Sequence, residues 1–170
     1  SLLTLDGYPL RRDWSQKLGA TASLDPATPD LADQIQAALP HASHHPGLDL
    51  AFELSGNPAA LDMAIGLMGF NGRILIGSWY GRKRANLDLG GHFHRNQIQL
   101  ISSQVSHLAP RWQGRWSKAR RLAVAWEMLQ TVQPQQLITQ RFPLEQAQQA
   151  YELIDLRPET AVQVVFIYDR

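Results

Sequence analysis

The sequence predicts an α/β protein built on a doubly wound parallel sheet. Apolar runs typical of strands alternate along the chain with apolar residues at helical spacing. The runs at residues 48–55 and 72–78 are nearly uninterrupted, as in parallel strands that helices cover on both faces. Both runs end in small residues, Ser55-Gly56 and Gly77-Ser78. In open α/β sheets, ligands bind at this carboxyl edge of the strands.

The first part of the chain is expected to contain two strands and two helices. Residues 2–5 and 22–24 are short strand candidates. Apolar residues four positions apart predict helices over 10–18 and 31–39. Gly19 follows the first of these helices, at the position where glycine commonly ends a helix.

The middle of the chain repeats the pattern more strongly. After the strand at 48–55, we predict a helix from Pro58 to Phe70, with proline in the first helical turn, where its fixed φ is suitable. The strand at 72–78 is followed by a glycine-rich, basic loop over 79–91 and by another strand at 98–103. This part therefore predicts parallel strands joined by helical crossovers.

The last part is expected to form a smaller unit. Residues 109–116 are irregular, and Ser117 is expected to cap the helix that follows. Beyond it we predict a strand at 137–139, a helix at 143–154 and a final strand at 161–168.

A change in composition at Pro134 places a domain boundary between residues 1–133 and 134–170. The chain opens directly in an apolar strand and has no initiator methionine. We therefore expect a fragment or processed piece of a longer protein.

Composition excludes several classes of protein. The chain has no cysteine, which excludes disulfides and cysteine-bound metals within it. A net charge of +1 favours no particular partner, and no apolar run reaches the length of a membrane span. We expect a soluble, cytoplasmic protein that has no membrane partner.

Asp6 is the first candidate ligand-binding residue. It follows the strand at 2–5, where dinucleotide-binding folds place an acid that accepts hydrogen bonds from the ribose hydroxyls. Such an acid repels a 2′-phosphate and favours NAD over NADP. Arg11 and Arg12 lie nearby and could pair with Asp6, stack on adenine or accept a 2′-phosphate. The alternative for Asp6 is an ordinary acid in a turn. The alternative for Arg11 and Arg12 is a solvated helix face.

The glycine-rich phosphate loop of dinucleotide-binding folds is absent. Its pattern, G-x-G-x-x-G, should precede the ribose acid by about twenty residues. Only five residues precede Asp6, and Gly66, Gly69 and Gly72 have the wrong spacing. They are better interpreted as a helix end and a turn. Either the first strand and its loop lie upstream of Ser1, or this is not a dinucleotide site.

Histidines offer a weaker metal signal. His44 and His45 are adjacent in a loop, and His92 and His94 form an H-x-H pair that a strand would place on one side. No carboxylate or cysteine stands at ligand spacing, so we expect no metal site in this chain.

Basic residues gather between Arg82 and Arg121, where Asp88 is the only acid and Trp112 and Trp116 are interleaved. Such a pattern can bind nucleic acid, but a solvated surface is the commoner explanation, and we expect no nucleic-acid partner. Ser102 and Ser103 have no nucleophile-elbow pattern around them.

Six segments follow one another along the chain: L-D-G-Y at 5–8, K-L-G-A-T at 17–21, L-D-L-A-F-E-L-S-G at 48–56, N-G-R-I-L-I-G at 71–77, L-I-T-Q-R-F-P-L-E-Q-A-Q-Q-A-Y-E-L-I at 137–154 and V-Q-V-V-F at 162–166. Taken in series, they resemble the C-terminal half of the zinc-type medium-chain alcohol dehydrogenases. No single segment is diagnostic, but their order and spacing match over nearly the whole chain. The resemblance implies a Rossmann-like sheet lacking its first strand and glycine loop, followed by a segment that returns to the catalytic domain.

The resemblance also implies site residues and partners. In that family the acid after the second strand holds the ribose, and later strand ends flank the two halves of NAD or NADP. The cofactor-binding residues expected here are Asp6, Arg11, Leu54, Ser55, Gly56, Ile76, Gly77, Ser78, Ser102 and Ser103. The region 87–104 is expected to pair two subunits edge to edge in a homodimer. The substrate would be a small alcohol or carbonyl compound.

Departures from the family limit this interpretation. The zinc ligands and the glycine fingerprint belong to the N-terminal half of the family and have no counterpart here, so we expect zinc only in that missing half. We therefore expect no catalytic residue in this chain and little activity from the chain alone. The rival hypothesis is a truncated, non-catalytic module that acts in dimerisation or assembly.

Overall fold

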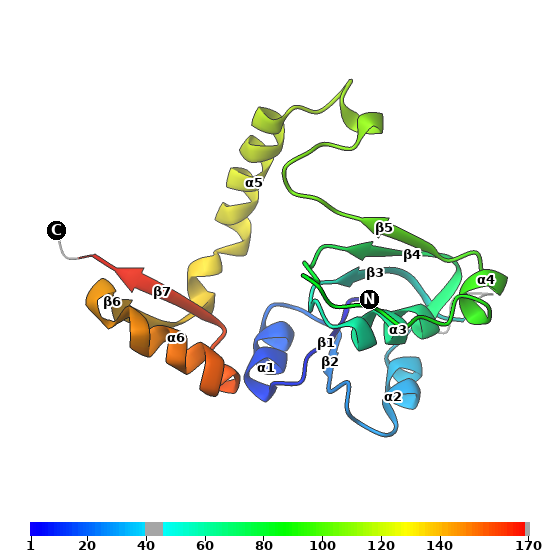
Figure 1. Ribbon diagram of the computed structural model, residues 1–170, viewed down its shortest axis with the longest axis horizontal. Helices are drawn as coiled ribbons and strands as arrows, with labels where there is room; N and C mark the ends of the chain where they lie inside the picture. The colour runs from blue at the N-terminus through cyan, green and yellow to red at the C-terminus, as the bar shows by residue number, and fades with distance from the viewer. Residues whose placement is uncertain (40–45, 169–170) are drawn as a thin grey trace. The chain divides into compact units, whose positions relative to one another are not determined.

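The computed structural model describes residues 1–39 and 46–168 (Figure 1). The chain divides into two compact units, one formed by residues 1–40 and 119–170 and the other by residues 41–118. The boundary predicted after residue 133 lies inside the first unit and stays a prediction.

The first unit begins with a parallel strand–helix–strand. Strand β1 (Leu3–Leu5) pairs in parallel with β2 (Ala22–Leu24), and helix α1 (Pro9–Lys17) connects them. Gly19 adopts φ 101° just beyond α1, a conformation that favours glycine. Helix α2 (Leu31–Ala38) follows and buries Leu31 and Ile35. These elements agree with those predicted from the apolar spacing.

The same unit ends in a second parallel pair. Helix α5 (Lys118–Val132) has no buried residue, and a 3₁₀ turn over Pro134–Leu137 leads into strand β6 (Ile138–Pro143). Helix α6 (Ala147–Leu156) connects β6 to the parallel strand β7 (Gln163–Ile167). The strand predicted at 137–139 therefore begins later and runs further, because the residues before Ile138 are in the 3₁₀ turn.

The second unit is a three-stranded parallel sheet in the order β3-β4-β5. Its elements are β3 (Leu48–Glu53), α3 (Pro58–Leu67), β4 (Met68–Ile76), α4 (His92–Arg95) and β5 (Gln99–Ser102). Asn57 caps α3 by accepting a 3.0 Å hydrogen bond from the Ala59 N–H.

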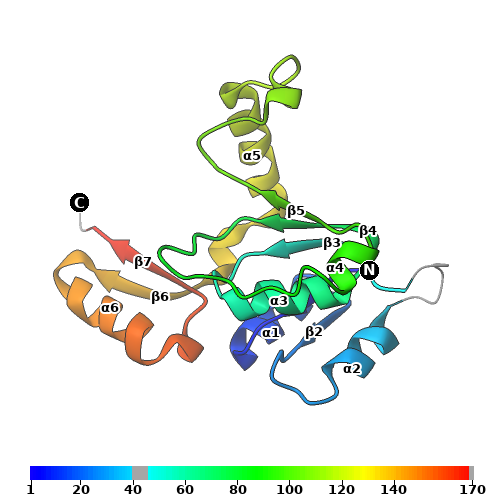
Figure 2. The ribbon, with the colours of Figure 1, turned by 45° about the vertical axis from the view of Figure 1, so that its right-hand side comes forward.

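The core of this unit lies on one face of the sheet, where α3 runs alongside the strands (Figure 2). Its buried members are Leu61, Ile65, Met68, Ile74 and Ile98. Side chains alternate between faces along a strand, so Leu50 and Phe52 lie on the opposite face. Phe52 is 62% exposed there. Among the described residues of this unit, helical cover is thus found on one face only.

The predicted end of one helix was wrong. The helix predicted to reach Phe70 ends at Leu67, because Met68 already pairs with Leu48 in the sheet. Gly47, with φ 111°, packs so closely on Gly69 that an added Cβ would lie 2.5 Å from the Gly69 nitrogen. The chain therefore turns into β4 through a close backbone contact that periodicity does not reveal.

His92 and His94, whose spacing would put both rings on one side of a strand, lie in the short helix α4.

The α/β class and the parallel strand pairing are confirmed. Among the described residues the strands form three separate sheets, and β1 and β3 each have one edge without a strand partner. Free edges of this kind agree with the prediction of a Rossmann-like sheet that lacks its first strand. No helix in the described ranges combines the length and apolar character needed to cross a membrane.

Candidate functional site

The carboxyl ends of β3, β4 and β5 meet at one edge of the second unit. The parallel register aligns Glu53 with Ile76, and Ile76 with Ser102. Backbone hydrogen bonds continue beyond the strands, from Gly77 N to Glu53 O at 3.0 Å and from Ser103 N to Ile76 O at 2.9 Å. The structure therefore brings one group of predicted residues to this edge: Leu54, Ser55, Gly56, Ile76, Gly77, Ser78, Ser102 and Ser103.

A buried carboxylate lies beneath this edge and was not predicted from the sequence. Glu53, only 5% exposed, accepts hydrogen bonds from Ser55 N at 2.7 Å, Ser55 Oγ at 2.5 Å and Gly56 N at 3.2 Å through its Oε1. Its Oε2 accepts from Ser78 Oγ and, at 2.6 Å, from the Tyr80 hydroxyl. We call these five residues the Glu53 cluster.

Hydrogen bonding determines the ionisation of the Glu53 cluster. Burial by itself would raise the pKa of Glu53, but hydrogen bonds from Ser55, Ser78 and Tyr80 outweigh it and lower this pKa below 4.5. Burial and the neighbouring Glu53 carboxylate raise the pKa of Tyr80 to about 12. At neutral pH the cluster thus contains an ionised glutamate and a protonated tyrosine.

Two glycines allow the loops at this edge to approach closely. Gly56 adopts φ 65°, and an added Cβ would lie 3.1 Å from the Trp79 carbonyl oxygen. A Cβ on Gly77 would lie 2.8 Å from Leu54 Cδ2. Small residues are therefore needed here for packing between the loops, in addition to any contact with a ligand.

The outer side of the edge is open and partly apolar. Leu54 is 72% exposed and Trp79 is 90% exposed. The Lys83 ammonium group donates a 3.0 Å hydrogen bond to the Gly56 carbonyl, which ties the basic part of the loop after β4 to the edge. This surface combines apolar side chains with backbone groups, a composition typical of sites for flat organic ligands.

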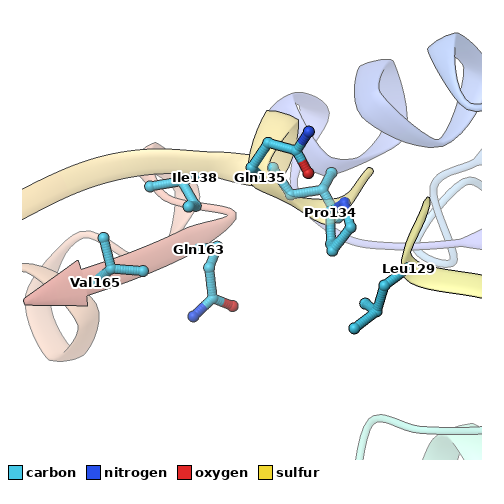
Figure 3. A pocket seen from close by; sticks show the side chains of 7 residues that line it. Leu129, Pro134, Gln135, Ile138, Gln163 and Val165 are labelled. Atoms are coloured by element: carbon cyan, nitrogen blue, oxygen red, sulfur yellow. The ribbon is translucent and has the colours of Figure 1, made fainter. Parts of the chain in front are cut away.

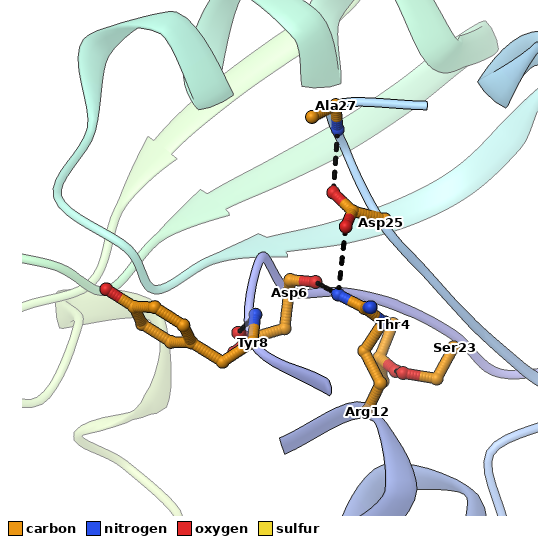
Figure 4. Close-up of polar contacts among 7 residues, drawn as sticks. All are labelled: Thr4, Asp6, Tyr8, Arg12, Ser23, Asp25 and Ala27. Carbon is orange, nitrogen blue, oxygen red and sulfur yellow. Dashed lines mark hydrogen bonds and ion pairs between the residues drawn. The ribbon is translucent and has the colours of Figure 1, made fainter. Parts of the chain in front are cut away.

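Asp6 lies in the first unit, directly after β1 (Figure 4). Its Oδ1 accepts a 2.8 Å hydrogen bond from the Tyr8 N–H. Arg12 donates to the Asp6 carbonyl oxygen at 2.7 Å and forms an ion pair with Asp25 at 3.2 Å (Figure 4). In the described residues no group bonds to Asp6 Oδ2.

Arg11 has a different environment from Asp6. Its guanidinium donates to the carbonyl oxygens of Pro158 at 3.3 Å and Ala161 at 3.4 Å, and lies 4.6 Å from the centre of the Tyr8 ring. Arg12, not Arg11, contacts the backbone of Asp6. A cofactor contact for Arg11 stays a prediction.

Histidines form no metal site in the part of the chain that the structure describes, where no three metal-ligating side chains gather. His92 Nε2 lies 2.7 Å from the Met68 carbonyl oxygen, and its Nδ1 lies 3.0 Å from the Asn96 side-chain amide. These contacts give His92 a structural role at the end of α3. His44 and His45 lie outside the described residues.

A shallow hollow of about 450 Å³ occurs in the first unit (Figure 3). Its lining consists of Leu129, Pro134, Gln135, Leu137, Ile138, Gln163 and Val165. The lining includes no titratable side chain, so the hollow offers no group for acid–base chemistry.

Comparison with known proteins agrees with the α/β fold described above. Residues 2–125 match the sequence model of a family described as zinc-binding dehydrogenase. No curated protein matches the chain.

Solved structures share the fold at low sequence identity. A zinc-dependent alcohol dehydrogenase 2 from Streptococcus pneumonia has a TM-score of 0.77 at 20% identity, covering 100% of this chain and 45% of its own. Benzyl alcohol dehydrogenase from Acinetobacter calcoaceticus has a TM-score of 0.73 at 19% identity, with coverage of 99% and 43%. An Escherichia coli alcohol dehydrogenase complexed with NADH has a TM-score of 0.72 at 15% identity, with coverage of 95% and 43%. This chain thus spans less than half the length of these structures.

Proposed function

The chain belongs to the zinc-binding dehydrogenase family, and from that premise we propose that it is the cofactor-binding portion of an NAD(P)-dependent alcohol dehydrogenase or reductase. The observation that carries the proposal is the shared carboxyl edge of β3, β4 and β5, with its small residues and exposed apolar side chains. Open α/β sheets bind nucleotides at such edges. The similar fold of the NADH-bound Escherichia coli enzyme supports the same ligand class.

Each group of residues has a distinct proposed task. Asp6 would accept hydrogen bonds from the adenosine ribose through its free carboxylate oxygen, which favours NAD over NADP. The backbone and small side chains at residues 54–56 and 76–78 would line the dinucleotide. Ser102 and Ser103 would contact the nicotinamide carboxamide.

The bound cofactor would supply hydride transfer to or from an alcohol or carbonyl substrate. The protein's part is to bind and orient the dinucleotide and to hold the edge in one conformation. The described residues do not fit a zinc ion, because no three potential ligands gather. We therefore assign no step to zinc in this chain.

We also propose that residues 87–104 pair two subunits.

Nucleotide-dependent thermal stability tests the proposal. The melting temperature of the intact protein should rise with NADH concentration and saturate, because a ligand that binds only the folded state stabilises it. AMP at the same concentrations serves as a partial-ligand control. A stable dimer whose melting no nucleotide changes would instead support the non-catalytic assembly module.

A further inference from the structure

We propose that Glu53 is a positioning residue that joins the loops after β3 and β4 and so sets the conformation of the edge on which the cofactor lies. This proposal rests on the proposed function. It assigns a role to a side chain that makes no ligand contact itself, since Glu53 is 5% exposed.

The two carboxylate oxygens of Glu53 divide their partners between the two loops. Among the described residues, Oε1 accepts only from the loop after β3, through Ser55 and Gly56. Within the same residues, Oε2 accepts only from the loop after β4, through Ser78 and Tyr80. One rigid, planar group therefore fixes the distance between two segments that are far apart in sequence.

Backbone hydrogen bonds reinforce this connection. The Glu53 carbonyl oxygen accepts from Gly77 N at 3.0 Å and from Ser78 N at 3.3 Å. Lys83 adds a further link by donating to Gly56 O. The loop after β4 is thus bonded to the end of β3 and to the loop after it, through Gly77, Ser78, Tyr80 and Lys83.

This attachment explains why the Trp79 side chain is so exposed. Ser78 and Tyr80 both direct their hydroxyl groups at Glu53, so the residue between them must point elsewhere. Trp79 is 90% exposed as a result, while its carbonyl oxygen lies close to Gly56. The Glu53 cluster therefore determines which groups of the edge face a ligand and which face the interior.

The chemistry of the cluster favours a carboxylate over an amide. Ser55 and Gly56 present backbone N–H donors that require an acceptor. A carboxylate accepts at both oxygens, whereas an amide has one acceptor and one donor group. A Glu53→Gln variant can satisfy the N–H groups, and the hydroxyls of Ser78 and Tyr80 can rotate to accept from the new amide. We expect partial rescue by Gln and none by Ala.

Cofactor affinity in the intact protein tests the proposal. NADH is titrated into wild type, Glu53→Gln, Glu53→Ala and Tyr80→Phe, with Glu152→Gln and Tyr168→Phe as controls. Glu152 and Tyr168 are both exposed and lie outside the cluster. We expect the Kd for NADH to rise about tenfold in Tyr80→Phe and Glu53→Gln, more in Glu53→Ala, and not in the controls.

Kinetics separate positioning from simple support of the fold. The KM for the cofactor should rise in Tyr80→Phe while the KM for the alcohol or carbonyl substrate stays unchanged. A variant with a lower melting temperature but an unchanged Kd would overturn the proposal, because the cluster would then serve folding only. Unchanged melting and unchanged Kd would overturn it as well.

A second measurement distinguishes this proposal from the proposed function. Tyrosine ionisation, followed by ultraviolet absorbance without nucleotide, should lose its component of highest pKa in Tyr80→Phe. If wild type keeps this component but binds neither NADH nor NADPH, the result contradicts the proposed function. The same result supports the hydrogen bonding of the Glu53 cluster. Absence of the component in wild type would contradict the cluster itself.

Discussion

Asp6 and Glu53 are acidic residues at the carboxyl ends of two parallel strands, yet their surroundings differ. Asp6 follows β1, is half-buried and has one bonded carboxylate oxygen. Glu53 ends β3, is buried, and has both carboxylate oxygens bonded. The comparison teaches that position at a strand end does not determine a carboxylate's role. An oxygen left free can bind a ligand, whereas a saturated carboxylate can only hold its neighbours in place.

The largest effect is expected from removing the saturated carboxylate. Glu53→Ala leaves several donors without an acceptor, so the free energy of unfolding should fall by about 3 kcal/mol. Urea unfolding of the variant and of the exposed control Glu152→Ala measures this change. A loss below about 1 kcal/mol would mean that the cluster contributes little to stability.

Removing the half-free carboxylate should act on binding and leave stability nearly intact. Asp6→Ala should weaken NADH binding about tenfold, because the ribose hydroxyls lose their acceptor. Its stability should change little, since only the Tyr8 N–H loses a partner. Titration calorimetry beside the exposed control Asp13→Ala measures both affinities, and an unchanged Kd would remove the ribose assignment.

Alkaline pH should reduce the stabilisation that Tyr80 contributes to the Glu53 cluster. The Tyr80 pKa is raised from 10.0 to about 12, so the unfolded chain ionises first. The stabilisation from Tyr80 is then complete below pH 10 and lost as the pH rises to about 12. The difference in unfolding free energy between wild type and Tyr80→Phe should shrink over this window. A difference independent of pH would contradict the hydrogen bond to Glu53.

The stabilisation from Glu53 depends on pH in the opposite direction, because it decreases as the pH falls. Its pKa is lowered from 4.5, so its stabilisation is complete above pH 4.5 and lost as the pH falls through the folded-state value. Glu53→Gln should therefore be less sensitive than wild type to acid in this range.

The smallest effect concerns the polar contacts around Asp6. Arg12 pairs with Asp25 at 3.2 Å and bonds to the Asp6 carbonyl, but both side chains of the pair are partly exposed. Arg12→Ala should lower the unfolding free energy by about 0.5–1 kcal/mol, and less at high salt. Thermal unfolding at two salt concentrations measures this loss of unfolding free energy. A loss as large as that of Glu53→Ala would contradict the difference proposed between the surroundings of Asp6 and those of Glu53.

The same comparison shows what sequence can predict. The positions of Asp6 and of the small residues at the edge follow from strand ends, which apolar runs and glycines mark locally. The parallel topology then brings these ends to common edges. Asp6 and the residue groups 54–56 and 76–78 were therefore predictable as candidates from the sequence.

Glu53 could not be found in the same way. It lies in the run L-D-L-A-F-E, where a single acid at the end of a strand is more often a solvated side chain. Its partners Ser78 and Tyr80 become neighbours only through the β3–β4 register, which places Glu53 beside Ile76. The nearest local signal is the Ser55-Gly56 pair, which offers N–H donors two and three residues after the acid.

The most direct test of the account is a crystal structure of the intact protein with NADH. We expect the adenosine ribose within hydrogen-bond distance of Asp6, the dinucleotide against residues 54–56 and 76–78, and Glu53 beneath them with no ligand contact. A nucleotide bound away from both strand ends, or directly bonded to Glu53, would contradict the account.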